Sequence, residues 1–145
     1  MVIFELEKIS LEALEAFVRL IPQLTDHSPP PIPEALGRMI ESPDTHIFFA
    51  RYPDSTGDIV GTAALATFQS PTGIHGWIED VVVDQNFRHK GIGKALTEAC
   101  IQKARELGLR EVNLTSNPNR KAANRLYRSM GFIQRETNVY RYPLD

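Results

Sequence analysis

The sequence predicts a single domain over residues 1–145 that combines helices with a sheet, an α/β (α+β) fold. The first observation behind this prediction is the order of strand-like and helix-like segments, β-α-α-β-β-β-α-β-α-β-β. The second is a strand, a glycine-bearing turn and a long helix that follow one another directly over residues 76–107. The third is the length, because 145 residues suffice for one hydrophobic core of ordinary size.

The N-terminal part begins with alternating residues 2–9, which predict a strand. Ser10 suits a helix N-cap, and helix-spaced apolar residues follow it at Leu11, Leu14, Phe17, Val18 and Ile21. Residues 22–33 contain five prolines and no apolar periodicity, so they predict a loop. A short helix is expected from Glu34 to about Ser42.

The middle of the chain carries the strongest patterns. Residues 45–52 and 59–68 are strand-like and are joined by turn residues, which predicts a hairpin. A loop over residues 69–76 is expected to lead to the apolar strand of residues 77–83. Helix-spaced apolar residues from Ile92 to Leu107 predict the long helix, and Gly108 supplies its end.

The C-terminal part is expected to complete the sheet. Residues 111–115 are strand-like, and the helix that contains Asn124 is expected to end at Gly131. Two closing strands are predicted over residues 132–134 and 138–142.

Composition excludes several function classes. The 16 Lys and Arg residues against 18 Asp and Glu residues leave no net field that would attract nucleic acid or an anionic membrane. One cysteine excludes an internal disulfide and favours a reducing compartment. The start of the chain lacks a signal-peptide pattern, and no run of 18 apolar residues occurs. We therefore expect a cytoplasmic protein with no membrane and no nucleic-acid partner.

The turn over residues 88–93 is suited to hold an anion, because the first backbone N–H groups of a helix have no intrahelical partner. Gly91 and Gly93 let the backbone approach a bulky anion such as a diphosphate. Positive or potentially positive charge surrounds them at Arg88, His89, Lys90 and Lys94. A P-loop is excluded because Lys94 is followed by Ala95, and the dinucleotide fingerprint fails because its third glycine falls on Leu96.

Two blocks together resemble a known family. The first is Arg-x-x-Gly-x-Gly after the valine-rich strand, and the second is Ala-Ala-Asn-x-x-Tyr-x-x-x-Gly-Phe over residues 122–132. With them the chain resembles the GCN5-related N-acetyltransferase (GNAT) family. The resemblance implies a central, mixed and mostly antiparallel sheet flanked by helices. It also implies acetyl-CoA as co-substrate and direct transfer of an acetyl group to the primary amine of a small molecule in a ternary complex.

The acceptor stays open in this interpretation. Peptide or protein N-acetylation and a non-catalytic, acetyl-CoA-binding regulatory module are the alternatives. In this family, acceptor specificity is associated with residues 22–42 and 137–142, which carry no readable pattern here. The proline-rich loop is therefore either a surface connection or a loop that overhangs the acceptor site. Dimerisation is common in the family, so a homodimer is an open expectation.

Two residues are predicted to be catalytic. Glu79 lies inside an apolar strand, where a carboxylate in a partly apolar cleft has a raised pKa and can act as a base. Alternation puts Glu79 and Asp80 on opposite faces, and the resemblance favours Glu79, directly or through water. The alternative is an ion-paired or solvent-facing carboxylate. The resemblance makes Tyr127 the general acid beside the coenzyme sulfur; the alternative is a core aromatic.

The resemblance also implies the residues that bind the coenzyme. A backbone N–H of the valine-rich strand would meet the oxyanion, and the glycine turn would hold the diphosphate. Asn124 and, unless it is only a turn residue, Asn117 would bind the pantetheine arm, beside Tyr127. The complete predicted set is Val81, Val82, Val83, Arg88, His89, Lys90, Gly91, Ile92, Gly93, Lys94, Asn117, Asn124 and Tyr127.

No metal site is expected, because the four histidines are scattered and no cysteine pair occurs. Cys100 falls on the apolar stripe of the long helix, which indicates a packing role and not an acyl-enzyme nucleophile.

Overall fold

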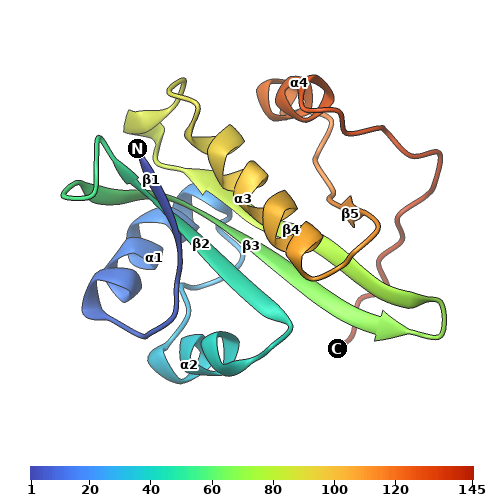
Figure 1. Ribbon diagram of the computed structural model, residues 1–145, viewed down its shortest axis with the longest axis horizontal. Helices are drawn as coiled ribbons and strands as arrows, with labels where there is room; N and C mark the ends of the chain where they lie inside the picture. The colour runs from blue at the N-terminus through green and yellow to red at the C-terminus, as the bar shows by residue number, and fades with distance from the viewer. The chain divides into compact units, whose positions relative to one another are not determined.

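A five-stranded sheet is the centre of the computed structural model, which describes residues 1–145 (Figure 1). The chain divides into two units, Met1–Thr115 and Ser116–Asp145, which are described separately. The first unit contains the whole sheet. The prediction of one domain over residues 1–145 stays a prediction.

The strands lie in the sheet in sequence order. The ladders between β1 and β2, β2 and β3, and β3 and β4 are antiparallel, whereas β4 and β5 are parallel. This mixed, mostly antiparallel sheet confirms the predicted fold class. The strands are β1 (Val2–Glu5), β2 (Thr45–Tyr52), β3 (Asp58–Ser70), β4 (Gly73–Val83) and β5 (Val112–Asn113).

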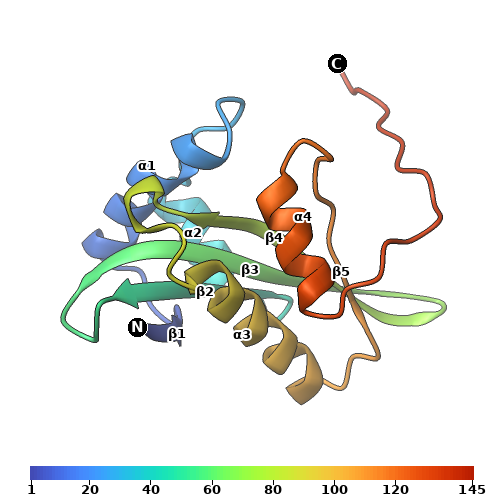
Figure 2. The same cartoon turned by 90° about the horizontal axis from the view of Figure 1, so that it is seen from above.

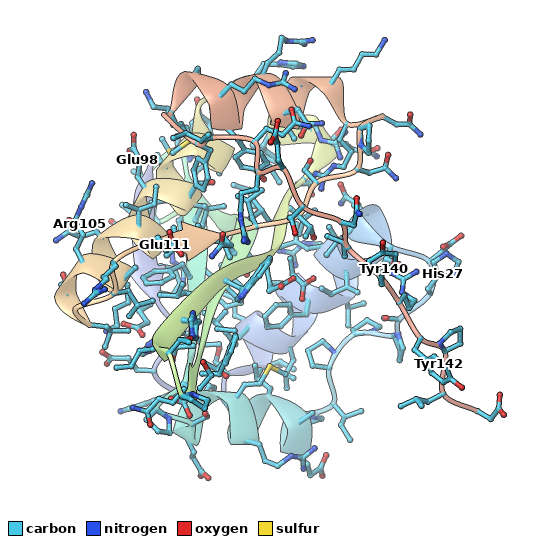
Figure 3. All side chains as sticks on the ribbon, turned by 90° about the vertical axis from the view of Figure 1, so that its right-hand side faces the viewer. His27, Glu98, Arg105, Glu111, Tyr140 and Tyr142 are labelled. Carbon is cyan, nitrogen blue, oxygen red and sulfur yellow. The ribbon has the colours of Figure 1, made fainter.

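Helices cover both faces of the sheet (Figures 1 and 2). On one face, α1 (Leu11–Leu24) and α2 (Pro33–Glu41) share a core with β2, β3 and the end of β4. On the other face lies α3 (Ile92–Glu106), where a Cβ added to Gly61 of β3 would lie 3.0 Å from Leu96 Cδ1. The middle of the sheet is therefore buried on both faces. Glu98 and Arg105 project from the outer side of α3, away from the sheet (Figure 3).

The sequence pattern explains α1. The Ser10 hydroxyl accepts a hydrogen bond from Ala13 N at 3.0 Å, which confirms the predicted N-cap. The buried stripe then repeats at helical spacing through Ala13, Ala16, Phe17 and Leu20.

Two predicted loop boundaries are wrong. The first loop was expected from Pro22, but α1 continues to Leu24 with Pro22 inside it. Only one backbone N–H is lost there, and the carbonyl that would accept it belongs to Val18, which is 59% exposed. The second loop, residues 69–76, is a tight hairpin, because β3 and β4 pair as far as Ser70 opposite Gly73.

The second unit contains α4 (Lys121–Ser129), whose end is followed by Gly131 in a left-handed conformation (φ 101°). The two predicted closing strands are wrong: residues 132–145 carry no strand, and Tyr140 and Tyr142 lie on a segment without regular structure (Figure 3). Strand propensity needs a partner strand to become a ladder, and the sheet ends at β5. Ile133 and Tyr140 are accordingly 88% and 87% exposed.

Candidate functional site

A bulge interrupts β4 at the predicted base. Ala64 of β3 lies opposite Glu79, and Thr62 lies opposite Val82, so one β3 residue faces two residues of β4, Asp80 and Val81. Asp80 has a left-handed backbone with φ of 53°. A bulge of this kind re-aims side chains and breaks strict alternation. The register keeps Glu79 opposite Ala64, while Asp80 and Val81 share the next β3 residue, so the prediction that Glu79 and Asp80 lie on opposite faces is not contradicted.

The strand partners show which face the Glu79 side chain takes. Thr62 and Ala64 are two residues apart on β3 and therefore share a face, so their partners Val82 and Glu79 share it too. Val82 belongs to the core with α1 and α2. Glu79 is thus directed to the α1 and α2 face of the sheet.

Glu79 is exposed and belongs to none of the ion pairs of the structure, so the solvent-facing form of the alternative fits it and the ion-paired form does not; its role as a base stays a prediction. Partial burial raises the pKa of the Glu79 carboxyl, and the neighbouring charge of Asp80 raises it further. This direction is the one expected for a base that works near neutral pH.

The edge of β4 is open on the side of β5. Their parallel ladder covers only Gly76 and Trp77, so β4 has no partner strand there over residues 78–83. Val81, Val82 and Val83 lie along this stretch, with Val82 buried and the other two half-buried. An unpaired strand edge can accept an extended ligand as an additional strand.

A short turn that the sequence interpretation missed connects β4 to α3. The Asp84 carboxylate accepts a hydrogen bond from Asn86 N at 2.9 Å and caps the 3₁₀ helix η1 (Gln85–Phe87). Gln85 N donates to Gln23 Oε1 at 2.8 Å, which attaches the turn to the end of α1. An aspartate two residues before an asparagine was the available signal, because Asp side chains bond the backbone two residues on.

Gly91 is the N-cap of α3 and has a left-handed backbone with φ of 78°. A Cβ at this position would meet no atom within 4 Å, so the need for glycine is conformational in the free protein. No side chain caps α3, which leaves its first backbone N–H groups available to an anion. The prediction of a helix directly after the glycine turn is confirmed, and the binding of an anion at this turn stays a prediction.

The predicted coenzyme-binding residues of this turn divide into two groups. Arg88, His89 and Lys90 are exposed, and Arg88 Nε donates to Val83 O at 3.3 Å. Lys94 lies 3.9 Å from Glu98 on the outer surface of α3. The others serve the fold with their side chains or carbonyls: Ile92 is 1% exposed, and the Gly93 carbonyl accepts from the Thr97 hydroxyl at 2.8 Å.

The second unit brings together its own predicted residues. Asn124 Nδ2 donates to the Asn117 carbonyl at 3.0 Å, and Asn117 Oδ1 accepts from Asn119 N at 2.9 Å. Asn117 therefore acts as a turn residue, which is the alternative to binding the pantetheine arm. The Tyr127 ring packs edge to face on Phe132, with ring centroids 5.5 Å apart.

Three further features concern metal ligands, the cysteine and the helices. Nowhere do three or more His, Cys, Asp or Glu side chains form a group that could hold a metal ion. Cys100 is fully buried, and burial raises the pKa of its thiol to about 12. Among the helices, none combines the length and apolar character needed to cross a membrane.

Comparison with known proteins gives consistent results. The model of the acetyltransferase (GNAT) family matches residues 11–132. The N-acetyltransferase YhdJ of Bacillus subtilis, itself uncharacterized, is 35% identical over 102 residues, which are 70% of each chain. Mycothiol acetyltransferase of Nocardiopsis dassonvillei is 39% identical over 71 residues, 48% of this chain and 22% of that protein.

A solved structure extends the likeness to nearly the whole chain. An aminoglycoside acetyltransferase from an uncultured soil metagenomic sample superposes with a TM-score of 0.84 at 24% identity, over 99% of this chain and 95% of that one. At this identity the likeness concerns the fold. The predicted N-acetyltransferase class is confirmed by the family model and by the relative from Bacillus subtilis. Because the matched residues include β4, the glycine turn and α4 together, the chain belongs to the acetyltransferase (GNAT) family.

Proposed function

We propose that the protein transfers the acetyl group of acetyl-CoA to the primary amine of a small molecule, by direct attack in a ternary complex. One observation carries this proposal: the open edge of β4 leads, through the Asp84 turn, into the uncapped N-terminus of α3 behind the left-handed Gly91. An extended pantetheine suits the strand edge, and a diphosphate suits the helix N-terminus.

The chemistry assigns one task to each residue. Glu79, directly or through a water, removes a proton from the acceptor ammonium, and the neutral amine forms a bond to the thioester carbon. A backbone N–H among Val81, Val82 and Val83 donates to the oxyanion of the tetrahedral intermediate. The attacking nitrogen releases its second proton to solvent, the carbon–sulfur bond breaks, and the Tyr127 hydroxyl protonates the leaving thiolate and is reprotonated from solvent. The pKa of Glu79, raised by burial and by Asp80, supports the first step.

Several residues would hold the coenzyme without taking part in the chemistry. The backbone of Gly91, Ile92 and Gly93 would bind the diphosphate, with charge from Arg88, His89, Lys90 and Lys94. Asn124 would bind the pantetheine arm. The turn bond of Asn117 argues for an indirect role, in which it fixes Asn124 through its carbonyl.

A small-molecule acceptor is supported by the neighbouring aminoglycoside acetyltransferase and by the mycothiol acetyltransferase relative. Holding the amine and the thioester in line would supply a large part of the rate enhancement, since orientation alone lowers the activation barrier by roughly 7–11 kcal/mol. A cytoplasmic location and a homodimer belong to this proposal as well; the single buried thiol supports the former.

The test is thiol release from acetyl-CoA by the wild type and Glu79→Gln in parallel. The acceptor panel contains amino sugars and their phosphates, polyamines, aminoglycosides, amino acids and short peptides. Release that depends on a small amine and falls in Glu79→Gln supports the proposal. Release with peptides alone would replace the acceptor class. Tight coenzyme binding without release for any acceptor would favour the regulatory alternative.

A further inference from the structure

Tyr52 is an aromatic residue outside the predicted site that contacts the connection between β4 and α3 at two residues, Phe87 and Lys90. It is the last residue of β2 and is half-buried. Its ring meets Phe87 of η1 edge to face, with centroids 6.0 Å apart and an interplanar angle of 66°. The Lys90 ammonium lies over the same ring, 5.4 Å from its centroid. A distance below about 6 Å is within the range of a cation–π interaction.

The turn that carries Tyr52 is rigidly built. A Cβ at Gly57 would lie 2.0 Å from the Tyr52 carbonyl oxygen, so the two ends of the β2–β3 turn are in direct backbone contact. Gly57 N donates to Asp54 O at 3.0 Å, and Arg51 Nη1 donates to Gly57 O at 3.1 Å. Arg51 in turn forms an ion pair with Glu12 of α1. The backbone that carries the Tyr52 ring is therefore held in place by hydrogen bonds and an ion pair.

The segment that the ring contacts is mostly exposed. Arg88, His89 and Lys90 are exposed, and His89 has a left-handed backbone with φ of 63°, which a residue with a side chain adopts at a cost. A lysine side chain on such a segment has many rotamers to lose when it is fixed. The ring of Tyr52 holds Phe87 at one end of the segment and Lys90 at the other, directly before Gly91.

We propose that Tyr52 is a positioning residue for the coenzyme: its ring holds the turn between β4 and α3 in the conformation that receives the diphosphate. This inference rests on the proposed function, because it takes acetyl-CoA as the ligand of that turn. Pre-ordering the turn before the ligand arrives lowers the entropy cost of binding. Its contacts are with the turn, so Tyr52 should act on coenzyme affinity and not on the chemical step.

The first experiment compares the wild type, Tyr52→Leu and Tyr52→Phe with two acetyl donors. Acetyl-CoA contains the diphosphate, whereas acetyl-pantetheine lacks it. Tyr52→Leu should raise the KM for acetyl-CoA roughly two- to fivefold at unchanged kcat, the fold-change that corresponds to losing an exposed cation–π contact. The kcat/KM for acetyl-pantetheine should stay at the wild-type value. Tyr52→Phe, which keeps the ring, should restore the KM for acetyl-CoA.

A second experiment measures whether Tyr52 acts through Lys90. Coenzyme A is titrated calorimetrically into the wild type, Tyr52→Leu, Lys90→Gln and the double variant. The effect of Tyr52→Leu on Kd should shrink in the Lys90→Gln background, because the two residues are in contact. Equal effects in both backgrounds, or equal losses with both donors, would show a general structural role and overturn the inference.

The two proposals fail in different ways. Coenzyme A binding with the same Kd in the wild type and in Tyr52→Leu overturns only the role of Tyr52. A wild type that binds no coenzyme A overturns the proposed function, and the role of Tyr52 with it.

Discussion

Asp80 follows Glu79 with a left-handed backbone, and both carboxylates are exposed at the bulge of β4. The pair lies in the part of β4 that has no partner strand on the β5 side, because β5 pairs only with Gly76 and Trp77. The charge of Asp80 disfavours the ionisation of Glu79, which adds to the effect of burial on the pKa of Glu79. Pairing with Ala64 thus sets the face that Glu79 takes, and the adjacent Asp80 contributes to its electrostatics.

Removing the Asp80 charge should move the acid limb of the pH profile of kcat/KM to lower pH. Burial and Asp80 both raise the pKa of Glu79, so in Asp80→Asn that pKa falls and the base stays deprotonated further into acid. Asn tolerates the left-handed backbone, so the bulge is retained.

Glu79→Gln should lower kcat by roughly 10²- to 10⁴-fold, the usual contribution of a general base. An acid limb that does not move in Asp80→Asn would contradict the assignment of Glu79.

Tyr127→Phe should lower kcat by roughly 10²-fold, the low end for a general acid, with little change in the Kd of coenzyme A. The ring contact with Phe132 is kept in this variant, so α4 should remain folded. Steady-state kinetics and calorimetric titration separate the two effects. Wild-type turnover in Tyr127→Phe would remove the acid role and leave Tyr127 as a packing residue.

Gly91→Glu should abolish binding of coenzyme A by placing a negative charge before the N-terminus of α3. Gly91→Gln is the matched control, because it has the same size and the same left-handed strain without the charge. The strain should cost about 1–2 kcal/mol of stability in both variants, since each places a side chain at φ of 78°. Calorimetric titration with coenzyme A should therefore separate the two variants, while their thermal unfolding should be alike. Equal affinities would locate the diphosphate elsewhere.

Cys100 should be unreactive in the folded protein. Burial raises the pKa of its thiol to about 12, so almost no thiolate forms at neutral pH. Ellman's reagent should label the thiol only after urea is added. Cys100→Ala should keep the wild-type kcat, with a lower melting temperature because a fully buried side chain is shortened. Loss of turnover with an intact fold would instead indicate an acyl-enzyme.

Glu5→Gln should destabilise the fold by about 1–2 kcal/mol at neutral pH, the range for hydrogen bonds to a charged group with partial exposure. Burial raises the pKa of Glu5, but hydrogen bonds from His46 at 2.7 Å and Lys103 at 3.1 Å outweigh it, so the net pKa of Glu5 is lowered from its usual value. The contribution is therefore present above the unfolded pKa and is lost as the pH falls through the folded one.

Urea unfolding of the wild type and Glu5→Gln over this pH range measures that loss. Glu7→Gln, at an exposed position two residues away, is the control. A difference between the wild type and Glu5→Gln that persists well below pH 4.5 would rule out a charged Glu5 as its source.

The helix after the glycine turn and the start of α1 could be predicted because their signals are local. The left-handed Gly91 and the helix that follows it depend on the conformational freedom of glycine and on apolar spacing, both of which are visible in a few residues. Ser10 predicted the start of α1 because an N-cap depends on a hydrogen bond to a backbone N–H only three residues away. The hairpin of β3 and β4 was underestimated, since Pro71 and Gly73 indicate a turn but not how far the strands pair on either side of it.

What the sequence by itself determined is the family, the order of elements as far as α4, and the identity of the residues at the glycine turn. Tertiary structure decided the rest. The bulge at Asp80 exists only as a mismatch in pairing with β3, and the open edge of β4 exists only because β5 is two residues long. The contacts of Tyr52 with Phe87 and Lys90 join residues 35 and more positions apart, and the absent closing strands lack a partner. Local patterns encode local geometry, whereas register, edges and long-range contacts depend on which segments meet.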